Sequence, residues 1–134
     1  MVVNLSSVAG VATSPLTAYT ASKYAVVGLS EGLLTEYGPQ GLEVVVICPG
    51  LIDTEIADAA AAAGHSSTEV NESMRSSLAK HGVPADIVAR DIVRAIRRPR
   101  FMVMTPAQAG VMRALHRLSP KLSRLLNRRM SHLG

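Results

Sequence analysis

A run of five apolar residues, Val44 to Cys48, constrains the fold of this chain more than any other segment. Four of the five are β-branched and no polar residue alternates with them, a pattern typical of a strand buried on both faces of a parallel sheet. Parallel strands are joined by a crossover of a dozen or more residues, usually a helix. The neighbouring segments are therefore expected to supply helices and a further strand.

The segment before this run predicts such a crossover. Small and apolar residues recur at three- and four-residue steps between Thr17 and Tyr37, which indicates a helix; they are Ala21, Ala25, Gly28, Leu29 and Leu33. The sequence "GPQG" (38–41) is a stop signal for that helix. The opening "MVVNLSS" reads as a short strand. A strand, a helix and a strand in this order predict a right-handed crossover.

The rest of the chain continues with helices around one more strand. We expect an alanine-rich helix after residue 56, a polar helix ending at Gly82, and a short strand, "FMVMTP" (101–106). The segment 84–100 is amphipathic, with a predicted apolar face made of Ile87, Val88, Ile92, Val93 and Ile96. Two basic helices broken at Pro120 follow. The predicted fold is α/β: a three-layer, Rossmann-like, doubly wound parallel sheet over residues 1–106, with a basic helical tail over residues 107–134.

The composition excludes several classes of protein. Apolar residues make up 48% of the chain, which is enough for a hydrophobic core. The single cysteine, Cys48, lies inside the apolar run, so we interpret it as a structural thiol in a reducing compartment. The histidines are scattered, and no cluster has metal-ligand spacing, so no metal site is expected. No apolar run is long enough to cross a membrane, and we expect a cytoplasmic protein.

Tyr19 and Lys23 form the most informative polar pair, because residues four apart lie on the same face of a helix. A nearby ammonium and the positive end of a helix dipole both favour the phenolate form of a tyrosine. Such a phenol can exchange a proton with a carbonyl or alcohol oxygen, and the serines that end the first strand can hydrogen-bond that oxygen. The spacing alone is also common between exposed helix residues without any such role.

Two further segments change the interpretation of this pair. "SSVAG" (6–10), "YTASK" (19–23) and "PGLIDT" (49–54) follow one another in this order. Together they resemble the short-chain dehydrogenase/reductase family, which carries a Ser-Ser-x-x-Gly type strand end, then Tyr-x-x-x-Lys, then Pro-Gly-x-x-x-Thr. The resemblance covers residues 2–106. It implies an oxidoreductase that transfers a hydride between NAD or NADP and a small alcohol or ketone.

The resemblance also implies a role for each matched residue. Tyr19 would be the catalytic acid/base, and Lys23 would favour its phenolate and hydrogen-bond the nicotinamide ribose. A serine would steady the substrate oxygen. Further contacts to the nicotinamide would come from Pro49, Gly50, Ile52 and Thr54. The cofactor itself would carry the hydride chemistry.

The identity of the catalytic serine stays open between Ser7 and Ser6. Matching "SSVAG" to the family motif selects Ser7, whereas the family's usual separation between serine and tyrosine fits Ser6. With Ser7, the loop before Tyr19 is one residue short, and a loop absorbs such a difference at little cost. We therefore prefer Ser7.

The family's first part has no counterpart in this sequence. Its glycine-rich turn binds the cofactor pyrophosphate at a helix N-terminus. Neither that turn, nor the residue that selects NAD or NADP, nor the asparagine of the catalytic set precedes "MVVNLSS". We expect a C-terminal fragment of a dehydrogenase with weak or no activity alone. The alternative is a catalytically silent binding or regulatory module that has the same fold.

The tail raises a separate question about partners. The net charge is +4, and no acidic residue follows Asp91. The tail leucines alternate with Arg and Lys at helical spacing, so they either pack on the domain or lie on an anionic membrane surface. Aromatic residues are too few for base stacking, so no nucleic-acid partner is expected. The resemblance also implies a homo-oligomer, a dimer or tetramer, in which small residues allow the tyrosine-bearing helices to pair; these are Ala25, Gly28 and Gly32.

Overall fold

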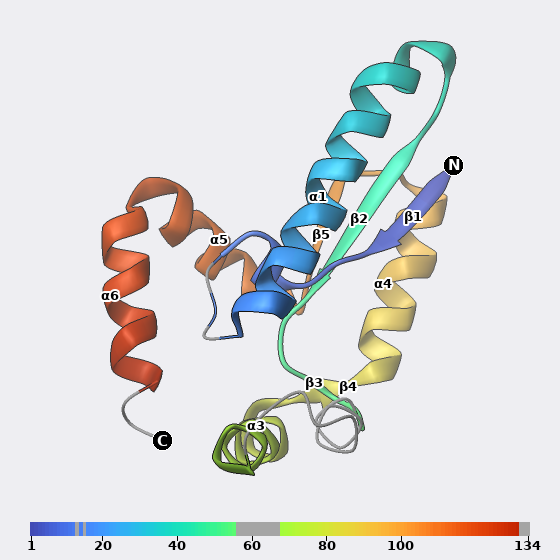
Figure 1. Ribbon diagram of the computed structural model, residues 1–134. Coiled ribbons are helices and arrows are strands. Elements are labelled where there is room, and N and C mark those ends of the chain that lie inside the picture. Colours follow the sequence, from blue (N-terminus) through green and yellow to red (C-terminus); the bar gives the residue numbers. More distant parts are fainter. Residues whose placement is uncertain (13, 15, 56–67, 132–134) are drawn as a thin grey trace.

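The central element of the computed structural model is a three-stranded parallel sheet, and the structure describes residues 1–12, 14, 16–55 and 68–131. Its strands are β1 (Val2–Leu5), β2 (Val44–Pro49) and β5 (Met102–Thr105), in the order β1-β2-β5 (Figure 1). Val2 pairs with Val44, and Val46 pairs with Met102. The predicted α/β class and parallel pairing are confirmed, and the apolar run forms the central strand.

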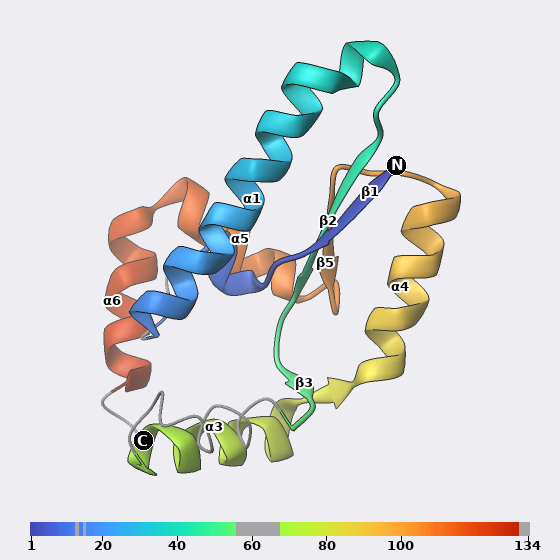
Figure 2. The same cartoon turned by 45° about the vertical axis from the view of Figure 1, so that its right-hand side comes forward.

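Two helices enclose this sheet and make a three-layer arrangement (Figure 2). α1 (Thr17–Tyr37) lies on one face and α4 (Ala85–Arg97) on the other. Because side chains alternate along a strand, β2 contributes to a core on each side. The α1 side contains Val27, Val46 and Cys48, and the α4 side contains Val45, Ile47, Val88 and Ala95. Burial on both faces explains why β2 has no polar alternation.

The α1 helix has the predicted bounds but turns a different face to the sheet. It is followed by η2 (Gly38–Gln40) and by Gly41, whose φ of 93° is the left-handed conformation typical of a glycine stop. The recurring residues used to predict the helix are largely exposed, and Leu29 is 62% exposed. Val27 and Ser30 are buried instead. Ser30 is tolerated there because its hydroxyl donates to Val26 O and accepts from the Asn4 side chain.

The apolar face predicted for α4 is wrong in part. Val88 is buried as expected, and Ile92 packs against the same core. Val93 and Ile96 are each 49% exposed, and Ala95 takes the buried position instead. Positions 88, 92 and 95 have the i, i+4, i+7 spacing of one helix face, which leaves Val93 and Ile96 off that face.

A second, two-stranded sheet was not predicted. β3 (Ile52–Asp53) pairs in parallel with β4 (Val83–Pro84), next to α3 (Thr68–His81). A Cβ added at Gly82 would clash with the Leu78 carbonyl oxygen and lie 3.1 Å from the Asp53 nitrogen, so glycine is needed at this junction. The alanine-rich helix expected after residue 56 lies outside the described residues.

The chain ends in two helices, α5 (Ala109–Leu118) and α6 (Pro120–Ser131). They are separated at Pro120, as predicted. Among the described residues, no helix is long and apolar enough to cross a membrane. The division of the chain at residue 106 stays a prediction.

Candidate active site

The carboxyl ends of β1 and β2 lie beside the first turns of α1 (Figure 1). β1 is followed by Ser6 and Ser7 and then by η1 (Val8–Gly10). In open α/β sheets, ligands bind outside the carboxyl ends of the strands. The three sequence motifs therefore approach one another at the edge of the sheet where a ligand is expected.

Lys23 lies between the Tyr19 ring and the end of β1. Its Nζ is 5.5 Å from the centroid of the Tyr19 ring, a distance at which a cation is attracted to an aromatic face. The same ammonium donates a hydrogen bond to Leu5 O at 3.4 Å. An ammonium has three N–H donors, so this contact leaves it capacity for a ligand. The predicted pair is thus brought to the strand end that carries the serines.

The two serines have different surroundings. Ser6 is 3% exposed, and its hydroxyl donates to Lys23 O at 2.9 Å, which fastens α1 to the end of β1. Ser7 Oγ accepts from Ala9 N at 3.1 Å and caps η1. Ser7 Oγ also lies 3.4 Å from Pro49 O, its acceptor at the end of β2. Ser6 thus binds to the helix backbone, whereas Ser7 lies between the two strand ends.

Gly10 makes the close contact between this loop and α1 possible. A Cβ at this position would lie 2.6 Å from Lys23 O and would clash with the Ser6 hydroxyl. Heavy atoms essentially never approach a Cβ so closely, so only glycine fits without a shift. The sequence showed Gly10 as part of a motif, but the reason for a glycine is this contact.

The residues after β2 divide into two groups. Gly50 N donates to Thr105 O at 2.8 Å, so Pro49 and Gly50 stay beside the sheet. Ile52 packs against the core on the α4 side, and the exposed Thr54 donates to Ile52 O at 3.5 Å. In the described part of the chain, neither Ile52 nor Thr54 makes a hydrogen bond or a core contact with Tyr19 or Lys23. The structure therefore brings Pro49 close to Ser7 but does not join the last two predicted residues to the pair.

Thr105 is a feature of this region that the sequence analysis missed. It ends β5 opposite Pro49 and is 0% exposed. Among the described residues, its hydroxyl has no hydrogen-bond partner. The available signal was its place at the carboxyl end of the last strand, where a polar side chain interrupts an apolar run.

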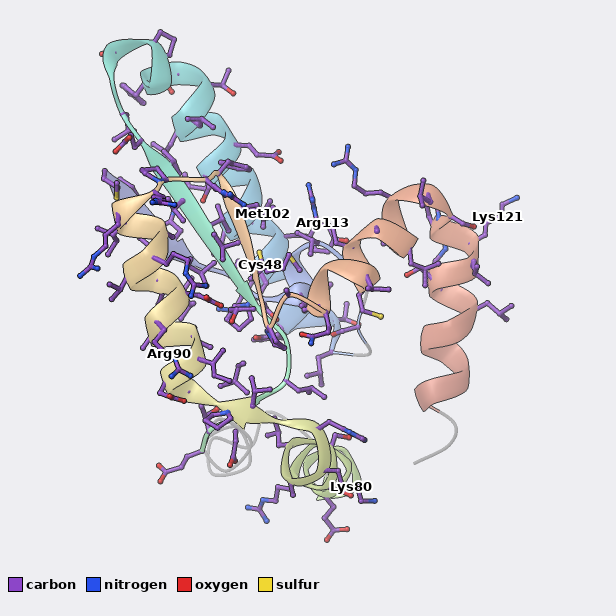
Figure 3. All side chains as sticks on the ribbon, turned by 180° about the vertical axis from the view of Figure 1, so that it is seen from behind. Cys48, Lys80, Arg90, Met102, Arg113 and Lys121 are labelled. Atoms are coloured by element: carbon purple, nitrogen blue, oxygen red, sulfur yellow. The ribbon has the colours of Figure 1, made fainter. Side chains whose placement is uncertain are left out.

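Cys48 lies under the site but is not available for chemistry. Figure 3 shows it beside the sheet, near Met102. Burial raises the pKa of the Cys48 thiol to about 11, although the Arg113 charge and hydrogen bonds from Ser7 and Ser6 act in the opposite direction. The thiol is therefore protonated near neutrality, and the interpretation of a buried structural cysteine is confirmed.

Comparisons with known proteins agree with these motifs. A family model described as "short chain dehydrogenase" matches residues 1–65. Oxidoreductase UcpA of Salmonella typhimurium is 45% identical over 62 residues, which are 45% of this chain and 24% of that protein. UcpA of Escherichia coli K12 is 41% identical over 81 residues, 59% of this chain and 30% of that protein. A 3-alpha-(or 20-beta)-hydroxysteroid dehydrogenase of Mycobacterium tuberculosis is 43% identical over 58 residues, 42% of this chain and 22% of that protein.

Solved structures match over more of the chain. A short-chain dehydrogenase from Burkholderia cenocepacia, in complex with NADP, aligns with a TM-score of 0.69 and 17% identity. A short-chain dehydrogenase from Streptomyces avermitilis aligns with a TM-score of 0.67 and 22% identity. These alignments cover 93% and 97% of this chain, and 46% and 50% of those chains. The chain thus spans about half the length of these structures and a smaller share of the curated relatives. The matched family model, the similar oxidoreductases and the shared fold show that the chain belongs to the short-chain dehydrogenase/reductase family.

Proposed function

We propose that this chain carries the proton-transfer site of an NAD(P)-dependent oxidoreductase acting on an alcohol or ketone. The observation that supports this most is the position of Lys23, whose Nζ lies 5.5 Å from the Tyr19 ring centroid and 3.4 Å from Leu5 O. These contacts hold the phenol and the ammonium beside the strand end where Ser7 lies. A proton donor, a cation and a hydroxyl near one strand end suit the proton-transfer step of reversible carbonyl reduction.

Each residue has a distinct part in this proposal. Tyr19 gives a proton to a ketone oxygen or takes one from an alcohol, and the Lys23 ammonium lies beside its ring. The Ser7 hydroxyl, weakly held by Pro49 O at 3.4 Å, rotates to donate to the substrate oxygen. Both serines are buried, but the Ser6 hydroxyl donates to Lys23 O at 2.9 Å, a shorter bond than that of Ser7, which favours Ser7 over Ser6 in this role.

The cofactor we propose is NAD or NADP, bound here through its nicotinamide end. The solved relative from Burkholderia cenocepacia binds NADP. The N–H donors of Lys23 suit the hydroxyls of a ribose, and we propose that Tyr19, Pro49 and Gly50 flank the ring. Ile52 and Thr54 stay proposed contacts. When bound, the nicotinamide supplies or accepts the hydride.

We propose a homo-oligomer that pairs through α1. Leu29 is 62% exposed on this helix, and a Cβ added at Gly28 or Gly32 would meet no atom within 4 Å. A small-residue face that is open in this way allows a second helix to approach closely.

A cytoplasmic location and weak dinucleotide binding by the isolated chain stay predictions. Calorimetric titration of the chain with NAD and with NADP tests the prediction of weak dinucleotide binding.

A turnover assay with two tyrosine variants tests the proposed function. At high protein concentration with reduced nucleotide and a panel of ketones, Tyr19→Phe is expected to lower the rate by about 100-fold or more. Tyr37→Phe makes the same change at the far end of α1 and is the matched control. Equal rates for the wild type and Tyr19→Phe, or equal losses in both variants, would contradict the proposal. Turnover that depends on Tyr19 would exclude the silent-module alternative.

A further inference from the structure

Polar contacts made by His116 connect the tail helices α5 and α6 to each other and to α1. These contacts identify the sides of α5 and α6 that face the rest of the molecule. His116 of α5 lies between two hydroxyls: Tyr24 OH is 3.4 Å from its Nε2, and Ser123 Oγ is 3.3 Å from its Nδ1. Ser123 is 0% exposed, so it marks the side of α6 that faces α5. The other described side chains of α6, at positions 120–122, 124 and 125, are exposed.

The residues around Ser123 carry both apolar and cationic groups. Leu122 and Leu125 are 44% and 50% exposed, and Lys121 and Arg124 are exposed as well. Figure 3 shows Lys121 pointing away from the body of the molecule. Because a helix advances 100° per residue, positions on both sides of Ser123 share the outer surface of α6.

The end of α5 also carries exposed apolar and cationic side chains. Leu118, the last residue of the helix, is 86% exposed, and Arg117 beside it is also exposed. Leu118 is two positions beyond His116 and therefore points to nearly the opposite side of the helix. We call the six exposed residues around the α5–α6 turn the tail surface; they are Arg117, Leu118, Lys121, Leu122, Arg124 and Leu125.

The charge of the tail surface is not balanced by neighbours in sequence. On α4, Arg90 pairs with Asp86 at 3.1 Å and Arg94 pairs with Asp91 at 2.8 Å. Residues 107–134 contain six Lys and Arg residues and no Asp or Glu, so the tail helices cannot form such pairs internally. The complementary partner is therefore anionic, and it has to accept leucine side chains as well.

We propose that the tail surface binds peripherally to an anionic membrane surface. The exposed leucines reach the boundary between headgroups and acyl chains, while Arg and Lys extend to the lipid phosphates. Nucleic acid is disfavoured as the partner, because residues 107–134 contain no Phe, Tyr or Trp for stacking on bases. This inference does not depend on the proposed catalytic function, and either can fail without the other.

Flotation with lipid vesicles tests this proposal, because bound protein rises with the vesicles while aggregates sink. The complete chain is expected to float with vesicles that contain phosphatidylglycerol and phosphatidylcholine, and to stay behind with phosphatidylcholine alone. The bound fraction should fall as salt is raised, since each basic residue near the surface contributes electrostatically. Equal binding to both vesicle types, or no binding, would overturn the proposal. Self-association through the tail without flotation would assign the surface to a second copy instead.

Paired variants locate the binding surface. Lys121→Gln with Arg124→Gln is expected to weaken binding to the anionic vesicles by about 30-fold, since two surface charges are removed. Leu118→Gln with Leu125→Gln should weaken it at least about tenfold. The matched controls are Arg97→Gln with Arg98→Gln, at exposed positions where α4 ends, and Leu51→Gln, which is 45% exposed. Losses in the controls as large as those in the tail variants would refute this location.

Discussion

Replacing Gly10 by alanine tests whether the loop after β1 is held against α1 as the structure indicates. The change adds one methyl group. That methyl would lie 2.6 Å from Lys23 O and 2.9 Å from the Lys23 carbonyl carbon. Among the described residues, Gly41 alone has a positive φ, so the backbone at Gly10 is open to alanine and the effect is steric.

The expected cost has two parts. Overpacking a well-packed site costs about 1–3 kcal/mol. If the Ser6 hydroxyl moves aside, it loses its bond to Lys23 O in a position that is 3% exposed, which adds about 1–3 kcal/mol. Alanine also lowers the conformational entropy of the unfolded chain, which stabilises the folded state by about 0.4–1 kcal/mol. The net loss of unfolding free energy for Gly10→Ala is therefore about 1–6 kcal/mol.

Urea unfolding followed by circular dichroism measures this loss, since the chain has no tryptophan to report by fluorescence. Gly110→Ala is the matched control: it makes the same change inside α5, where the added methyl would lie 3.8 Å from the nearest Met104 atom, an ordinary van der Waals contact. The control should be stabilised by up to about 1 kcal/mol. A Gly10→Ala protein that is within about 0.5 kcal/mol of the wild type would refute the packing described here.

Three further predictions concern buried polar groups. Ser30→Ala should lower the unfolding free energy by about 1–3 kcal/mol because Asn4 loses its acceptor, whereas the exposed Thr35→Ala should change it by less than about 0.5 kcal/mol; urea unfolding distinguishes them. Thr105→Val should raise it by about 1 kcal/mol because an unpaired buried hydroxyl is removed, and a loss of stability would reveal a bound partner. The Cys48 thiol has a pKa of about 11 in the folded chain and 9.0 when exposed. The contribution of the neutral buried thiol to the unfolding free energy should therefore be fully present below pH 9 and be lost as the pH rises from 9 to 11. Cys48→Ala lacks the titrating thiol, so the difference in unfolding free energy between it and the wild type should change between pH 9 and 11. A difference that stays constant over this range would contradict the prediction.

The sequence predicted the elements whose pattern is strong. The β-branched run became β2, and the glycine and proline after Tyr37 gave the end of α1. The convergence of Tyr19, Lys23 and the serines also followed from motif order. A parallel sheet brings successive strand ends to one edge, so motifs at those ends are placed together without knowledge of side-chain contacts.

The features that the sequence did not predict depend on contacts between distant segments. Ser30 is polar and still lies on the buried face of α1, because Asn4 and Val26 O satisfy its hydroxyl. β3 and β4 have two residues each, too few to show a period of two. The different surroundings of Ser6 and Ser7 are set by acceptors on α1 and β2, which sequence separation alone does not reveal.

The central claim is that Tyr19 and Lys23 form a site for the nicotinamide end of a dinucleotide. Saturation-transfer NMR tests it most directly, because the method detects weak binding and reports which part of the ligand touches the protein. With NAD or NADP in excess, the account predicts stronger transfer to the nicotinamide protons than to the adenine protons. That preference should disappear in Lys23→Ala and persist in Lys121→Ala. Stronger transfer to adenine, or an unchanged pattern in Lys23→Ala, would contradict the account.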